Sequence, residues 1–146
     1  MACDSAWLPL AQVRGYNSAM SNTVQHAVAE YFAALRAMDV ERWVNTFAPD
    51  GVSHDPVGSP AMHGHDELRK FLTQIFSGFD TAGLTENSVF INGYSAAVKW
   101  TGEGVAKNGK AVRFEGIDVI HCNEQGKITL VHAYWDPAPV MAVLMS

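Results

Sequence analysis

The periodicity of hydrophobic residues changes once along this chain, near residue 78, and this change constrains the fold more than any other feature. Before it, hydrophobic residues recur every three or four positions, the spacing of one face of a helix. After it, they alternate with polar residues over long stretches, which is typical of strands that bury one face. Helices followed by an antiparallel meander indicate the α+β class, in which the helices cover one face of the sheet.

The chain fits one domain preceded by a short extension. Its 146 residues, 48 % hydrophobic and 17 % charged, match an ordinary globular domain. Asn22 or Thr23 is placed to cap the first helix, with Met20 just before it. Residues 1–20 carry no periodic hydrophobic pattern, so we expect a flexible, dispensable N-terminal extension there. Residues 21–146 then form the domain itself.

Two more helices and four strands complete the predicted elements. Asp39 caps a short second helix that includes Phe47 and ends at Pro49, and a third helix follows Gly64. An Asn–Gly pair at residues 108–109 predicts a type I′ turn between the second and third strands, because both positions of that turn need positive φ. The predicted strands cover residues 84–91, 96–106, 111–122 and 127–135.

Composition and spacing argue against several kinds of partner and site. The formal net charge is -5 with no cluster of Lys or Arg, so nucleic acids and anionic membrane surfaces are poor partners. No run approaches the roughly 18 apolar residues of a membrane span. Cys3 and Cys122 lack metal-ligand spacing and fit a reducing, cytoplasmic setting. His54, His63 and His65 are close in sequence, but no metalloenzyme motif accompanies them, so no metal is expected.

A carboxyl group on a hydrophobic face is the first functional signal. Asp118 lies on the face of its predicted strand that otherwise carries hydrophobic residues or glycine, namely Val112, Phe114, Gly116 and Ile120. Burying an ionised carboxylate without partners costs on the order of several kcal/mol. Asp118 therefore either pairs with an arginine or is kept neutral and used.

Two further polar groups share this pattern. Tyr31 lies in the hydrophobic stripe of the first helix, and Asp55 lies in a short extended segment before Pro56. A phenol and two carboxyls in one cavity suit proton transfer, provided that their surroundings separate their pKa values. Each residue also has a purely structural interpretation. A buried tyrosine with a satisfied hydroxyl is a common core residue, and an aspartate before proline commonly forms a turn.

The residues around these groups resemble a known enzyme family. The segments AEYFAALRAMDVERWVNTFAPDGVSHDPVGSPAMHGHDEL (residues 29–68) and FEGIDVIHCNEQGKITLVHAYWDPAPV (residues 114–140) resemble bacterial ketosteroid (Δ5-3-ketosteroid) isomerases. These enzymes belong to the superfamily that resembles nuclear transport factor 2 (NTF2) and the SnoaL polyketide cyclases. The resemblance covers residues 24–139. It implies an NTF2-like α+β cone, with three N-terminal helices packed in the concave face of a curved antiparallel sheet.

The resemblance also implies roles for individual residues. Tyr31 matches the oxyanion-hole tyrosine, Asp55 the general base and Asp118 the protonated oxyanion-hole acid. Such an enzyme is a steroid Δ-isomerase, which moves a C=C bond into conjugation with a ketone through a dienolate and uses no cofactor or metal. Its ligand, a small apolar ketone such as a steroid, would occupy a pocket lined by Trp135, Phe47, Leu72, Phe114 and Val28.

The chain departs from this family near the expected site. Phe47 and Leu72 stand where the best-known members carry two tyrosines that support the oxyanion-hole tyrosine. The hydrogen-bond network is therefore shorter here. His54 directly precedes the expected base. The missing tyrosines bear on catalytic power rather than on the location of the site.

Two other functions stay open. A SnoaL-like cyclase that closes a ring by an aldol reaction would need chiefly one acid/base, best placed at Asp118. A non-catalytic module that binds an apolar ligand or serves in dimerisation would need none of the three groups. We also expect a homodimer that forms through the outer face of the sheet, which carries Arg113, Glu115, Ile117, Val119 and His121.

Overall fold

Within residues 10–146, which the computed structural model describes, the chain forms four helices and six strands. The helices are α1 (Leu10–Arg36), α2 (Val40–Val44), α3 (Gly64–Phe76) and α4 (Ala138–Leu144). The strands are β1 (Phe47–His54), β2 (Met62–His63), β3 (Phe79–Asn92), β4 (Ser95–Ala106), β5 (Ala111–Cys122) and β6 (Ile128–Trp135).

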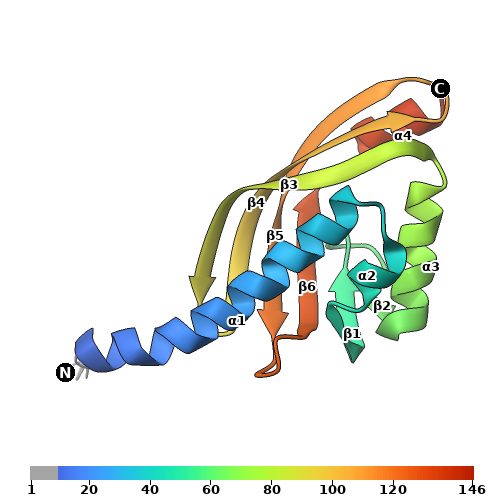
Figure 1. Cartoon of the computed structure of the whole chain (residues 1–146). Helices are drawn as coiled ribbons and strands as arrows, with labels where there is room; N and C mark the ends of the chain where they lie inside the picture. The colour runs from blue at the N-terminus through green and yellow to red at the C-terminus, as the bar shows by residue number, and fades with distance from the viewer. Residues whose placement is uncertain (1–9) are drawn as a thin grey trace, which may run out of the picture.

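The strands form one curved sheet in the order β2-β1-β6-β5-β4-β3. From β3 to β6 each strand runs antiparallel to the next, as the alternating pattern predicts. The exception is β1, which runs parallel to β6. The helices α1, α2 and α3 lie against the concave side of the sheet (Figure 1). The predicted α+β arrangement is therefore confirmed.

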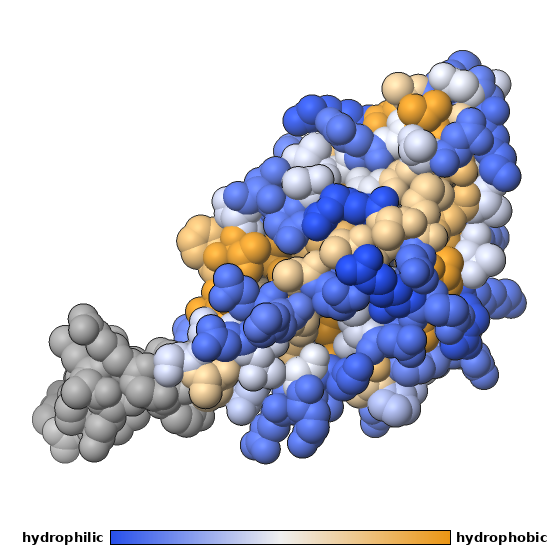
Figure 2. Space-filling view, viewed as in Figure 1, coloured by the Kyte–Doolittle hydropathy of each residue, from blue (hydrophilic) through white to orange (hydrophobic). Residues whose placement is uncertain are grey.

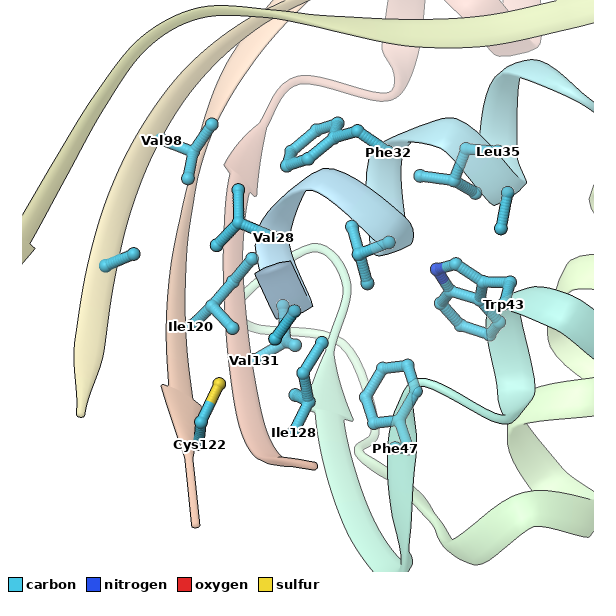
Figure 3. Close-up of a cluster of buried hydrophobic side chains, with 14 of the residues drawn as sticks. Val28, Phe32, Leu35, Trp43, Phe47, Val98, Ile120, Cys122, Ile128 and Val131 are labelled. Atoms are coloured by element: carbon cyan, nitrogen blue, oxygen red, sulfur yellow. The ribbon is translucent and has the colours of Figure 1, made fainter. Parts of the chain in front are cut away.

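The core lies between α1 and the concave face of the sheet. Val28 and Phe32 of α1 approach Val98, Ile120 and Val131, which come from three neighbouring strands (Figure 3). Hydrophilic residues cover much of the outer surface of the helices, and hydrophobic residues appear mainly between α1 and the sheet (Figure 2). No helix in residues 10–146 is both long and apolar enough to cross a membrane.

Two helix starts agree with the sequence. The side chain of Asp39 accepts a hydrogen bond of 3.0 Å from the backbone N–H of Arg42, so Asp39 caps α2 as predicted. α3 begins at Gly64 and buries Leu68 and Leu72. α2 packs against α1 and α3, and α3 packs against β1, so the two helices cover the part of the concave face beside α1. Each buries one side of its helix in this way.

The first helix is longer than predicted. It runs without a break from Leu10, so the predicted cap at Asn22 or Thr23 is wrong. The Thr23 hydroxyl instead donates to the Ala19 carbonyl at 3.1 Å, a bond that Thr makes inside a helix. Residues 1–9 lie outside the described residues, and the dispensability of the N-terminal extension stays a prediction.

Two further boundaries differ from the prediction. α2 ends at Val44, and Phe47 begins β1, where it pairs with Ile128 of β6. The predicted continuation of this helix to Pro49 is therefore wrong. Pro49 lies where the β1–β6 register shifts, a place that tolerates a residue without an N–H. The C-terminal helix α4 was not predicted.

The hairpin between β4 and β5 forms at the predicted place with a different turn. The backbone N–H of Ala106 closes a three-residue loop with a hydrogen bond of 2.9 Å. Of the Asn–Gly pair only Gly109 has a positive φ, 84°, so the predicted type I′ turn is wrong. A two-residue turn would place Lys99 opposite Asp118, whereas the observed loop places Val98 there.

Candidate active site

Asp118 lies in the middle of the concave face and is only 1 % exposed. Trp100 on the neighbouring strand β4 donates its indole N–H to Asp118 Oδ1 at 2.8 Å. Burial and, after it, the charge of Asp55 raise the pKa of Asp118 to about 8, although hydrogen bonds from Trp100 and Tyr31 act to lower it. Within residues 10–146 Asp118 forms no ion pair, so the arginine alternative is not what the structure contains.

Asp55 directly follows β1 and faces the same side of the sheet. Trp135 donates its indole N–H to Asp55 Oδ1 at 2.6 Å. Burial of the carboxyl raises the pKa of Asp55 to about 6, and the bond from Trp135 opposes this rise. Unlike Asp118, Asp55 keeps part of its surface exposed to solvent. Its carboxyl has the lower pKa of the two and ionises at lower pH. Each of the two carboxyls is therefore held by a tryptophan.

A row across three strands sets the spacing of the two carboxyls. Ala133 of β6 pairs with Asp118 on one side. On the other side His54 pairs with His132, so the next residue, Asp55, lies beside Ala133. Two strand spacings of about 4.8 Å place the two aspartate Cα atoms about 10 Å apart. Ala133 contributes only a methyl group between them.

Tyr31 of α1 lies over this row and is buried. Its ring centroid is 5.1 Å from that of Phe32, 5.7 Å from that of Trp43 and 6.0 Å from that of Phe47. Burial, followed by the charges of Asp118 and Asp55, raises the pKa of Tyr31 well above its usual value. The structure thus brings the three expected groups together, and the phenol remains a hydrogen-bond donor at neutral pH.

The five expected pocket residues fall into two groups. Phe114 and Trp135 keep some exposed surface, and their ring centroids lie 5.5 Å apart next to Asp55. The other three residues are buried in the core between the helices and the sheet, namely Val28, Phe47 and Leu72. Of the five residues, Trp135 is the one that contacts Asp55 directly.

Two open surface hollows lie away from these groups. One, of about 700 Å³, lies between α1, α2 and the β5–β6 turn, and it includes Glu30, Arg42 and Lys127. The other, of about 630 Å³, lies beside Arg36 over β3, β4 and β5. Neither includes Tyr31, Asp55 or Asp118. Tyr31 and Asp118 are buried, whereas Asp55 keeps part of its surface exposed.

The histidines do not converge on one point. His65 Nε2 lies 2.9 Å from the carbonyl oxygen of Phe47. His54 stacks on His132, with ring centroids 4.8 Å apart, on the opposite side of the sheet from Asp55. In the part of the chain that the structure describes, no three His, Cys, Asp or Glu side chains form a group that could hold a metal.

Trp100 and Ala133 were missed by sequence reasoning. Trp100 pairs with Gly116, two residues before Asp118, and this register follows from the three-residue loop between β4 and β5. A two-residue turn would have directed Trp100 to the other face. The signal that could have identified it is the alternation of β4, which places Trp100 on the same face as the buried Val98.

A curved sheet that holds ionisable side chains under three helices is the NTF2-like arrangement, and the predicted fold is confirmed. Residues 28–131 match the SnoaL-like domain, and the chain belongs to this family. The matched region includes Tyr31, Asp55 and Asp118 but ends before Trp135.

Solved structures with the same fold share little sequence with this chain. SalBIII, described as an epoxide hydrolase/cyclase-like enzyme of pyran ring formation in the polyether salinomycin, is 22 % identical, with a TM-score of 0.73 over 82 % of this chain and 95 % of that one. An NTF2-like protein of unknown function from Burkholderia pseudomallei is 20 % identical, with a TM-score of 0.73 over 85 % and 98 %. A candidate isomerase from Bacillus subtilis is 17 % identical, with a TM-score of 0.74 over 86 % and 95 %. At these identities the likeness concerns the fold.

Proposed function

We propose that this protein catalyses proton transfer next to a ketone, moving a C=C bond into conjugation as ketosteroid isomerases do. The observation that carries the proposal is the pair of buried carboxyls, because the pKa of Asp55 is raised to about 6 and that of Asp118 to about 8. At neutral pH the first is mostly ionised and the second mostly neutral. One group accepts a proton while the other donates a hydrogen bond.

Each of the three groups has one task in this reaction. The Asp55 carboxylate removes a proton from the carbon next to the ketone and returns it to the far end of the conjugated system. The negative charge of the dienolate gathers on the ketone oxygen, where Tyr31 and neutral Asp118 donate hydrogen bonds. Donors fixed where charge develops contribute about 3 kcal/mol each to the lowering of the barrier. The proton that leaves the substrate returns to it, so no group is consumed.

The surroundings favour a small apolar ketone, such as a steroid, as the substrate. Trp135 contacts Asp55. The Phe114 ring extends this aromatic surface, with its centroid 5.5 Å from that of Trp135 and 5.7 Å from that of Trp100. Flat apolar rings pack well against such surfaces. The polar groups around the ligand would be the three that act on it.

Substitutions of the two carboxyls test these roles. Asp55→Asn removes the proton acceptor, so kcat should fall by several orders of magnitude. Asp118→Asn keeps an N–H donor at the ketone oxygen and should cost far less than Asp118→Leu. The assay is conversion of a Δ5-3-ketosteroid to the Δ4 isomer, followed by enone absorbance, with folding checked by circular dichroism. Equal losses in Asp118→Asn and Asp118→Leu would reject the neutral-donor role.

A cyclase is the second candidate, because the chain belongs to the SnoaL-like family and one solved relative by fold is described as cyclase-like. In an aldol ring closure Asp118 would be the chief acid/base. The order of the variants then reverses, with Asp118→Asn severe and Asp55→Asn mild. If the protein only binds an apolar ligand, neither substitution changes the measured function much.

A further inference from the structure

Trp43 of α2 carries a polar atom that lacks a partner. The residue is buried, and its indole N–H makes no hydrogen bond with any group in residues 10–146. Buried donors are nearly always paired, because an unpaired one loses its bond to water and gains none in return. Of the three tryptophans at this site, Trp100 and Trp135 donate to the carboxyls of Asp118 and Asp55. Trp43 is the exception and requires a reason.

The position of Trp43 is fixed from two sides. Asp39 caps the helix that carries it, and its ring packs edge-on against Phe47 with centroids 4.9 Å apart. Its other neighbour is the Tyr31 ring, with centroids 5.7 Å apart and planes at 50°. The Phe47 ring offers the indole only its π face, which is a weak acceptor. The oxygen of the Tyr31 hydroxyl is a full acceptor. The indole acts to lower the pKa of that hydroxyl, although the two groups are outside hydrogen-bond geometry.

We propose that Trp43 is a positioning residue whose indole N–H donates to the Tyr31 oxygen when Tyr31 itself donates to the negatively charged oxygen of a ligand. This inference rests on the role of Tyr31 in the proposed function. As Tyr31 gives its proton toward the ligand oxygen, negative charge builds on its own oxygen and attracts the N–H. A small shift of the ring closes the bond, and each bond strengthens the other.

This role explains why an unpaired donor is kept in the core. Without a ligand the N–H is unsatisfied, and its burial costs folding free energy. A phenylalanine at this position would not have this cost. With a charged ligand oxygen the donor is satisfied. The arrangement is therefore ready for the charged intermediate rather than for the empty site, as catalysis by differential binding requires.

The first test measures Tyr31 directly and needs no catalysis. Tyr31 is replaced by a fluorinated tyrosine, whose phenol ionises closer to neutral pH, and its ionisation is followed by absorbance. Removing the indole N–H by Trp43→Phe should raise the phenol pKa by about one to two units, the size of one hydrogen bond to a charged oxygen. Benzothienylalanine at position 43 keeps the shape of the indole without its N–H, and it should give the same rise in the phenol pKa. It serves as the second variant if the protein with Trp43→Phe does not fold. An unchanged pKa in both variants overturns the inference.

The second test uses kinetics and a double-mutant cycle. Trp43→Phe should lower kcat three- to tenfold with little change in KM. In a Tyr31→Phe background the same substitution should have no further effect, because the oxygen that it serves is gone. Additive losses would show that Trp43 acts through packing alone and would overturn the inference. If the proposed isomerase function is wrong, activity is absent throughout, whereas the phenol pKa still rises in the first test.

Discussion

The two carboxyls of the site differ because of what surrounds each of them. Asp118 is enclosed by the sheet and the helices and lies in the field of Asp55, so both effects raise its pKa. Asp55 lies at the end of a strand and keeps part of its surface, so its pKa rises less. A tryptophan N–H opposes the rise in each case. One residue type is thereby suited to two opposite tasks.

We expect the pH dependence of kcat/KM to be bell-shaped. Activity should rise as Asp55 ionises through about pH 6 and fall as Asp118 loses its proton above about pH 8. The two limbs belong to the interacting pair rather than to single residues. In Asp118→Asn the alkaline limb should disappear while the acidic limb stays. A flat profile between about pH 5 and about pH 9 would contradict the assignment.

The buried acid should also make stability depend on pH. The pKa of Asp118 is about 8 in the folded protein, against about 3.9 for an unfolded aspartate. The folded state holds the proton more tightly, so this stabilising contribution is complete below about pH 4 and is lost as the pH rises through about 8. Asp118→Asn removes the dependence and keeps an acceptor for Trp100. The difference in Tm between Asp118→Asn and the wild type should widen from about pH 4 to about pH 8. A constant difference would count against a raised pKa of Asp118 in the folded protein.

A second unpaired polar atom belongs to Ser53, whose side chain is fully buried and has no hydrogen-bond partner among the residues that the structure describes. Ser53→Ala should raise the free energy of unfolding by about 1 kcal/mol, because the desolvated hydroxyl is removed. Ser95→Ala is the matched control. The Ser95 hydroxyl lies 2.6 Å from His121 Nδ1, so its loss should lower stability by about 1 kcal/mol. Denaturant unfolding measures both, and a clear loss in Ser53→Ala would mean that its hydroxyl is satisfied in solution.

At the scale of elements, hydrophobic periodicity predicted the helices and strands that bury one face against the core. α3 and the strands β4, β5 and β6 were predicted close to their observed bounds, because each alternates or repeats against the core. β3 starts at Phe79, earlier than the predicted start at Leu84. The parallel pairing of β1 with β6 joins segments far apart in sequence, which periodicity does not reveal. The start of α1 at Leu10 and the whole of α4 have no clear hydrophobic period of their own. For the site, Asp55, Asp118 and Tyr31 were predicted to lie together, but Trp100 was missed because the turn has one more residue.

Gly116 of β5 allows both tryptophans to reach their carboxyls. It pairs with Trp100 on one side and with Trp135 on the other. A Cβ at this position would lie 2.5 Å from the Trp100 ring, 2.6 Å from the Tyr134 carbonyl oxygen and 2.8 Å from Trp135 Cβ. Gly116→Ala should therefore destabilise the fold by about 1–3 kcal/mol and displace the indoles. Thermal unfolding and near-UV circular dichroism measure these effects, and an unchanged Tm would contradict the crowding.

At the scale of the whole molecule, the two faces of the sheet differ in how they are covered. The concave face is covered by helices, whereas the outer face exposes large hydrophobic side chains. Phe90 is 72 %, Tyr134 52 % and Ile117 44 % exposed. Ile117 pairs directly with Tyr134 across β5 and β6, so these two form one continuous patch. Patches of this kind on an uncovered sheet are typical of protein–protein interfaces.

We expect this face to form a two-fold symmetric homodimer. Light scattering should give the mass of a dimer at micromolar concentration. Ile117→Lys would bring two charges into the symmetric contact and should yield a monomer with the fold intact. Lys110 is exposed at the turn beyond the patch, and Lys110→Glu provides a control that should stay dimeric. A monomeric wild-type protein would rule the dimer out.

The row from Asp55 through Ala133 to Asp118 has a consequence for how relatives of this protein diverge. The separation of the two aspartate Cα atoms is a property of the backbone, because it equals two steps of strand pairing. Substitutions of the aromatic residues Phe114 and Trp135 would change the surroundings of Asp55 without altering that separation. The distance between the proposed base and the proposed donor to the ketone oxygen is thus inherited with the sheet, while the molecule that binds between them is free to change.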